Sequence, residues 1–245
     1  MRTLYDKSRL GFAIVWIIVY CAMMSVGDAV SEIIGISKSV SLLVGLLLSA
    51  ILIVFLKKHE LLDAYGLCAP KASLKKMLYY VPVIIMLTAN LWYGVRLNFG
   101  VVETVLYILT MFCVGFLEEI IFRGLLFEAM RKDSVRAAVI VSSVTFGVGH
   151  IVNLVNGSGA QLLPNMLQVI YATAAGFMFV MMYYRSKSLW TCIIAHGLFN
   201  AISVFSNNEV GEEMQIVSAI MLTVITGSYA IYLAIGNKRD KDFEC

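Results

Sequence analysis

Two adjacent glutamates and an arginine interrupt an apolar run near the middle of the chain, in the stretch Val114-Gly-Phe-Leu-Glu-Glu-Ile-Ile-Phe-Arg-Gly-Leu-Leu-Phe127. A charged side chain at membrane depth costs a few kcal/mol or more, so such residues usually face a protein interior or a cavity and mark function. At about 100° per residue, Glu119 and Arg123 share one helical face and can form an ion pair. Glu118 lies about 140° from Arg123 around the helix, so its own helix does not neutralise it. This spacing makes Glu118 a candidate for chemistry.

Taken alone, the three charges are also compatible with a structural cluster that joins two helices, because buried ion networks also serve packing. Two of the three histidines, His150 and His196, also fall inside apolar runs. Phe146 precedes His150 by four positions and Asn200 follows His196 by four, so each pair shares a helical face. A single intramembrane histidine is often only a hydrogen-bonding residue between helices.

The depth of these residues favours a shared site. Counting 1.5 Å per residue from the predicted cytoplasmic helix ends places Glu118 about 15 Å, His150 about 20 Å, His196 about 12 Å and Asn200 about 18 Å into the membrane. A carboxylate beside a histidine can hold and deprotonate a water, and a second histidine with an asparagine can donate hydrogen bonds to an oxyanion. Together they form a set for peptide hydrolysis that needs no serine or cysteine nucleophile.

The composition excludes an ordinary soluble domain. Of the 245 residues 60% are hydrophobic and 14% charged, and the mean hydropathy is +0.85, which is typical of a polytopic membrane protein. We predict an all-α bundle of about eight transmembrane helices in a single domain, 1–245, with a motif-bearing core at about 103–206. Runs that can span about 30 Å of hydrocarbon occur at 10–27, 40–56, 76–95, 103–128, 136–151, 162–184, 188–206 and 214–235.

The basic residues indicate the orientation of the bundle. The N-terminus, every second connection and the C-terminus hold all of the 19 lysines and arginines except Lys38, Arg96 and the intramembrane Arg123. By the positive-inside rule, we predict a multi-pass protein of the cell membrane with both termini in the cytoplasm. The five cysteines have no C-x-x-C spacing and indicate neither a disulfide nor a metal site.

Three motifs carry a resemblance to a known family. In order and spacing the chain resembles the CAAX-processing and bacteriocin-immunity membrane proteases, also called the CPBP or Abi family, on the motifs Glu118-Glu119-x-x-x-Arg123, Phe146-x-x-x-His150 and His196-x-x-x-Asn200. Each motif alone is weak. The three in sequence, on separate membrane helices, are specific over roughly residues 103–206.

The resemblance implies an intramembrane glutamic endopeptidase. In that family pattern Glu118 and His150 activate the water, His196 and Asn200 form the oxyanion hole, and Glu119 with Arg123 is the supporting pair. The implied substrate is a hydrophobic or lipid-associated peptide or protein in contact with the lipid bilayer, and no nucleic acid is expected. The family includes enzymes that trim prenylated C-termini and bacterial relatives linked to bacteriocin immunity or peptide-signal maturation, and this compact chain resembles the bacterial kind.

Three other functions are compatible with the same residues. The chain has no H-E-x-x-H and no G-x-G-D motif, but Glu118, His150 and His196 are a ligand set suitable for catalytic zinc. Asn200 favours a metal-free mechanism, because a zinc ion would largely take over the stabilisation of the oxyanion. We predict no metal and no other cofactor. A non-catalytic immunity or scaffold protein and a transporter are the remaining alternatives.

Overall fold

The computed structural model describes residues 1–156, 160–207 and 209–242. This part of the chain consists of helices and their connections and has one isolated bridge, between Val95 and Ser206, in place of any strand. The elements in chain order are α1 (Arg2–Lys7), α2 (Arg9–Ile34), α3 (Ser39–Lys58), η1 (Asp63–Tyr65), η2 (Lys75–Tyr80), α4 (Val81–Leu87), η3 (Ala89–Leu91), α5 (Val101–Glu118), η4 (Glu119–Phe127), α6 (Glu128–Met130), α7 (Val135–Gly149), η5 (His150–Leu154), α8 (Leu162–Ser186), α9 (Trp190–Ile202), η6 (Ser203–Phe205) and α10 (Glu212–Asp242).

Six helical stretches of the described chain are long and apolar enough to cross a membrane: Arg9–Ile34, Ser39–Lys58, Val101–Met130, Val135–Leu154, Leu162–Ser186 and Glu212–Gly236. A seventh apolar stretch, Trp190–Phe205, is shorter. Large apolar side chains cover the outside of these helices, with Leu43 66% and Ile18 61% exposed. Contiguous apolar surface of this kind belongs against lipid. The all-α membrane fold predicted from the apolar runs is therefore confirmed.

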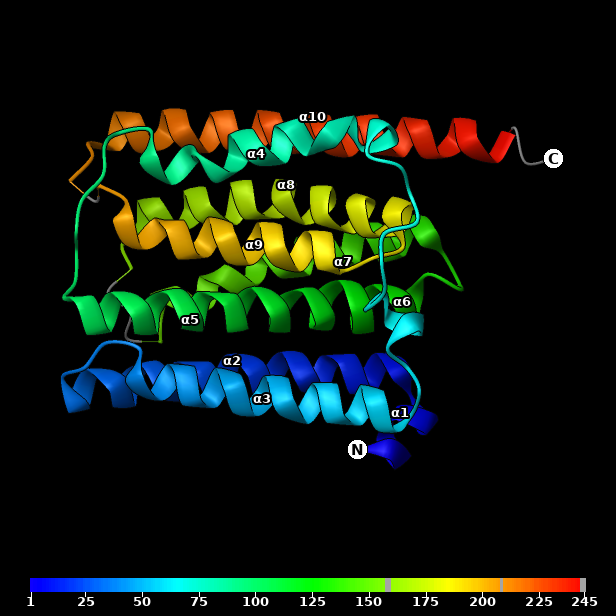
Figure 1. The fold of residues 1–245 in the computed structure, drawn as a ribbon, viewed down its shortest axis with the longest axis horizontal. Coiled ribbons are helices and arrows are strands. Elements are labelled where there is room, and N and C mark those ends of the chain that lie inside the picture. Colours follow the sequence, from blue (N-terminus) through cyan, green and yellow to red (C-terminus); the bar gives the residue numbers. More distant parts are fainter. Residues whose placement is uncertain (157–159, 208, 243–245) are drawn as a thin grey trace.

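The segment predicted as a continuous helix over 76–95 is broken in the structure. Leu78, Tyr79 and Tyr80 all have positive φ angles, and only the short helices α4 and η3 follow them. Pro82 lies in the first turn of α4, where a missing N–H costs nothing because the first turn has no intrahelical acceptor. Pro82 therefore starts a helix and does not interrupt one. The segment still carries the chain from one end of the bundle to the other (Figure 1).

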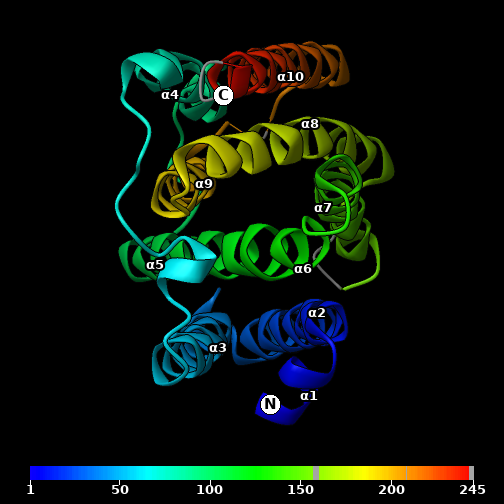
Figure 2. The ribbon, with the colours of Figure 1, turned by 90° about the vertical axis from the view of Figure 1, so that its right-hand side faces the viewer.

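The helices form layers that place the motif helices at the centre. Figure 2 shows α2 and α3 in one outer layer, α5 with α6 in the next, α7, α8 and α9 beyond them, and α4 with α10 on the opposite outside. The long helices run parallel or antiparallel to one another along the horizontal direction of Figure 1. The three helices that carry the sequence motifs are therefore enclosed on both sides.

Helices α5 and α9 approach each other closely at a pair of glycines. A Cβ atom on Gly115 would lie 2.7 Å from the backbone nitrogen and 2.8 Å from the Cα of Gly197. Real Cβ atoms do not come so close, so only glycine allows the two backbones to meet here. Because Glu119 follows Gly115 by one turn and His196 precedes Gly197, this contact brings a carboxylate and an imidazole together.

The two described ends of the chain lie at the same end of the bundle. Figure 1 shows α1 and the last turns of α10 on the right, together with the connections that follow α3, α6 and α8. The connection between α2 and α3 and the start of α10 lie on the left. The arrangement agrees with the sidedness inferred from the basic residues, and the cytoplasmic assignment of that end stays a prediction.

Candidate active site

The helix of the first motif changes its geometry at the paired glutamates. It is α-helical to Glu118 and then continues as the π-helix η4. The sequence predicted an α-helix throughout this stretch. Such π segments are rare and frequently lie at functional sites. The wider turn belongs to a segment whose nine residues are all buried.

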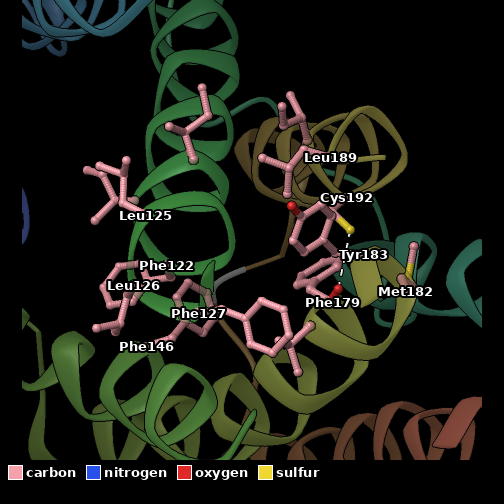
Figure 3. Close-up of a cluster of buried hydrophobic side chains, with 14 of the residues drawn as sticks. Phe122, Leu125, Leu126, Phe127, Phe146, Phe179, Met182, Tyr183, Leu189 and Cys192 are labelled. Atoms are coloured by element: carbon pink, nitrogen blue, oxygen red, sulfur yellow. Dashed lines mark hydrogen bonds between the residues drawn. The ribbon is translucent and has the colours of Figure 1, made fainter. Parts of the chain in front are cut away.

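The predicted ion pair is present in this π segment. Arg123 Nη1 donates a hydrogen bond of 3.0 Å to Glu119 Oε1, and both side chains are fully buried. The guanidinium carbon lies 4.1 Å from the ring centre of Phe146 and 5.4 Å from that of Phe179. Cation–π attraction of this kind offsets part of the cost of removing the charge from water. Figure 3 shows both rings in the buried cluster around η4 and α8.

His196 lies between the two glutamates. Its Nδ1 is 2.8 Å from Glu119 Oε1 and its Nε2 is 3.4 Å from Glu118 Oε2. Because a carboxylate paired with arginine only accepts hydrogen bonds, Nδ1 of His196 carries the hydrogen. The ring stacks on Phe179 at 5.3 Å and meets Phe146 edge-on at 5.5 Å. The sequence predicted an oxyanion role for this histidine and did not anticipate its contacts with the glutamates.

Glu118 is held by a residue that the sequence analysis missed. The hydroxyl of Tyr20, in α2, donates a hydrogen bond of 2.7 Å to Glu118 Oε1. The Glu118 side chain is 13% exposed, whereas that of Glu119 is fully buried. The only signal for Tyr20 in the sequence is a phenol in the middle of the first apolar run. Glu118 is therefore the carboxylate of the pair that remains partly open to solvent.

His150 is fixed in place by backbone contacts. Its Nδ1 lies 3.0 Å from the carbonyl oxygen of Phe146, and its own carbonyl accepts a hydrogen bond of 2.9 Å from Asn165 in α8. Because a carbonyl oxygen only accepts, Nδ1 donates, and in the neutral ring Nε2 keeps its lone pair. His150 begins the turn η5 that follows α7. The predicted grouping of Phe146 with His150 is thus a direct contact.

One cavity of about 320 Å³ collects the predicted residues. Its wall contains Glu118 from the first motif, His150 with Phe146 from the second, and His196 with Asn200 from the third. Glu119 and Arg123 lie behind this wall, fully buried. The structure therefore separates the seven predicted residues into five that face the cavity and a buried pair that supports them.

The described residues contain no group of three His, Cys, Asp or Glu side chains arranged to hold a metal ion. Of the set proposed for zinc, Glu118 and His196 approach each other to 3.4 Å, and His150 lines the same cavity. The donor types suit zinc. The absence of a metal stays a prediction, which the metal content of the purified protein tests.

The motif-bearing part of the chain is similar to a known protein family. Residues 100–202 match the family model described as type II CAAX prenyl endopeptidase Rce1-like. We call residues 100–202, which are similar to that family, the Rce1-like segment. The Rce1-like segment spans α5 to α9 and contains all seven residues predicted from the motifs. The resemblance predicted from the three motifs is confirmed for this segment.

A curated relative agrees with the Rce1-like match. The chain is 34% identical over 94 residues to the "Putative membrane peptidase YdiL" of Bacillus subtilis (strain 168). The aligned part is 38% of this chain and 33% of the relative, so the match covers about a third of the length of that protein. Tyr20 lies outside the Rce1-like segment, so the hydrogen bond to Glu118 comes from a helix that the family model does not cover.

Proposed function

We propose that the protein is an intramembrane endopeptidase that hydrolyses a peptide bond in a hydrophobic or membrane-associated peptide. The observation that carries the proposal is the convergence of a carboxylate, two imidazoles and a carboxamide on one cavity: Glu118, His150, His196 and Asn200. The Rce1-like match over the same residues supports it.

Glu118 acts as the general base. The hydrogen bond from Tyr20 fixes one oxygen of the carboxylate, and the neutral His150 ring offers Nε2 as an acceptor to a water in the cavity. A water held by these two groups gives its proton to Glu118 while its oxygen attacks the carbonyl carbon of the peptide bond. The same proton then passes to the leaving nitrogen as the carbon–nitrogen bond breaks.

Asn200 and His196 stabilise the oxyanion that forms on the former carbonyl oxygen. The amide N–H of Asn200 donates from the cavity wall. His196 already gives its Nδ1 hydrogen to Glu119, so it supplies a second donor through Nε2 when the ring carries both hydrogens. Donors that are fixed before the reaction stabilise the developing charge at little cost in reorganisation. The role of Glu119 and Arg123 is then to hold His196 in this orientation.

The biological setting follows from the resemblance. The family relatives lead us to propose the maturation of a bacterial peptide signal, or bacteriocin processing or immunity, in the cell membrane. Both ends of the chain would be cytoplasmic in this setting, as the basic connections indicate.

The substitution Glu118→Gln tests the proposal. It nearly preserves shape and removes the base, so the purified variant should fold and produce no cleavage of hydrophobic peptides followed by mass spectrometry. Glu103→Gln is the matched control: Glu103 lies on the same helix and accepts a hydrogen bond from the backbone of Ser37, so its loss should leave cleavage unchanged. A Glu118→Gln variant that cleaves like the wild type would instead favour a non-catalytic immunity or scaffold protein.

A further inference from the structure

Three buried aromatic rings line one end of the cavity. Phe122, Phe146 and Phe179 line it at the level of Glu118 and His196, and Phe122 and Phe146 contact each other edge-on with ring centres 5.4 Å apart. Behind them lies the fully buried Arg123. On η4, α7 and α8 no described residue nearer to the end of the bundle that holds both termini lines the cavity. We refer to the three rings as the aromatic floor.

The other end of the cavity is polar and belongs to the opposite end of the bundle. Its wall there contains Asp28 and Lys38 beside the connection between α2 and α3, Asn153 and Asn156 after α7, and Ser203 after α9. Lys38 Nζ lies 2.8 Å from Asp28 Oδ1, and the hydroxyl of Ser41 also donates to that oxygen. Such charged and amide groups suit a water-filled entrance, which we call the mouth.

The distribution of basic residues assigns a side of the membrane to this mouth. The connections at the end with both termini hold Lys57, Lys58, Arg131 and Lys187 among many others, and the opposite end holds Lys38 and Arg96. An excess of lysine and arginine marks the cytoplasmic side. The connection between α2 and α3, which borders the mouth, lies at the end opposite to that excess (Figure 1), so the mouth faces away from the cytoplasm.

We propose that the cavity receives its substrate from the non-cytoplasmic side of the membrane. The substrate class that follows is a hydrophobic peptide segment presented at that surface, such as an exported peptide or the outer part of a membrane protein. This statement about the substrate rests on the proposed peptidase activity, whereas the direction of the mouth does not. Peptides present only in the cytoplasm meet the aromatic floor and have no path to Glu118.

Cysteine labelling tests the direction of the mouth without any need for cleavage. Asn156→Cys introduces a thiol at the mouth, and Lys58→Cys introduces one at the exposed cytoplasmic end of α3. Each variant is expressed in a bacterial inner membrane and treated with a membrane-impermeant methanethiosulfonate, in spheroplasts and in inside-out vesicles. Mass spectrometry of the peptide that contains the new cysteine distinguishes it from the native cysteines.

The expected result is full labelling of Asn156→Cys in spheroplasts and none in inside-out vesicles, with the reverse for Lys58→Cys. Labelling of both variants from the same side would overturn the proposal, as would labelling of Asn156→Cys from the vesicle exterior alone. If Asn156→Cys does not fold, Asn153→Cys replaces it, because Asn153 also lines the mouth. Labelling from outside combined with an absence of cleavage would refute the peptidase and leave the direction of the mouth standing.

The substrate itself is tested in sealed proteoliposomes. The vesicles are first sorted into the two orientations of the protein by the accessibility of the thiol in Lys58→Cys. A fluorogenic hydrophobic peptide is then added to the outside of each fraction. Cleavage is expected only where the mouth faces the added peptide. Equal cleavage in both orientations, with the peptide shown to remain outside, would contradict entry through the mouth.

Discussion

Tyr20 and Glu118 are 98 positions apart in the chain and are joined by a hydrogen bond of 2.7 Å from the phenol to Oε1 of the carboxylate. The contact links the end of α5 to α2, a helix that lies outside the Rce1-like segment. It fixes one oxygen of Glu118 and leaves the other toward His196.

We expect Tyr20→Phe to lower kcat/KM by about 10- to 100-fold, because a hydrogen bond to a charged group contributes about 1.5–3 kcal/mol. The measurement is the rate of peptide cleavage by purified protein, with thermal unfolding as a check on the fold. Tyr107→Phe is the matched control, since Tyr107 also lines the cavity but its hydroxyl contacts Ser203 at 3.0 Å. Equal rates for Tyr20→Phe and the wild type would remove Tyr20 from the mechanism.

Arg123→Met should destabilise the protein strongly. Removing one partner of a buried ion pair costs about 3–5 kcal/mol, because the other charge stays buried and unpaired. Glu119 would be that charge. The double variant Glu119→Gln with Arg123→Met should recover much of the lost stability and still be inactive, since His196 loses its carboxylate partner. Thermal unfolding in detergent measures the first effect, and a single variant as stable as the wild type would show that the pair is not needed.

Gly115→Ala should impair catalysis by forcing α5 and α9 apart. The added methyl group would lie 2.7 Å from Gly197, and displacing a catalytic group by about 1 Å can cost about 100-fold in rate. Gly227→Ala is the control, because a Cβ there meets nothing within 4 Å and alanine favours a helix over glycine. Cleavage rates measured side by side decide the matter: a fully active Gly115→Ala would mean that the close approach is dispensable.

Metal removal should leave activity intact. If Glu118 is a general base, a strong zinc chelator has nothing essential to remove, and elemental analysis of the purified protein should find less than stoichiometric zinc. If instead Glu118, His150 and His196 hold a zinc ion, turnover should stop with the chelator and return when zinc is added back. The cleavage assay before and after chelation, with the metal content of the same sample, separates the two mechanisms.

Contacts within one helix could be predicted from spacing alone. Glu119 and Arg123 are four residues apart, and the expected ion pair forms although the local helix is π and not α. The all-α fold follows equally directly from long apolar runs. In both cases the information is local, because helical periodicity fixes which side chains are neighbours.

Contacts between helices could not be predicted in this way. Nothing in the first apolar run shows that Tyr20 meets Glu118, because periodicity does not say which face of one helix meets another. The break before α4 has the same origin. Met77 is fully buried and its carbonyl accepts a hydrogen bond of 2.6 Å from Tyr229 in α10, so tertiary contacts shape a segment whose apolarity alone indicated one long helix.

The aromatic floor also matters for the ion and proton gradients across the membrane. A water-filled hollow that reaches the middle of a bilayer is half of a channel, and a second hollow from the other side would let protons and ions leak down their gradients. The rings of Phe122, Phe146 and Phe179 offer no polar group to a hydrated ion, and the charge of Arg123 behind them is already paired with Glu119. The cavity can thus hold water at the depth of Glu118 without opening a path for ions across the membrane.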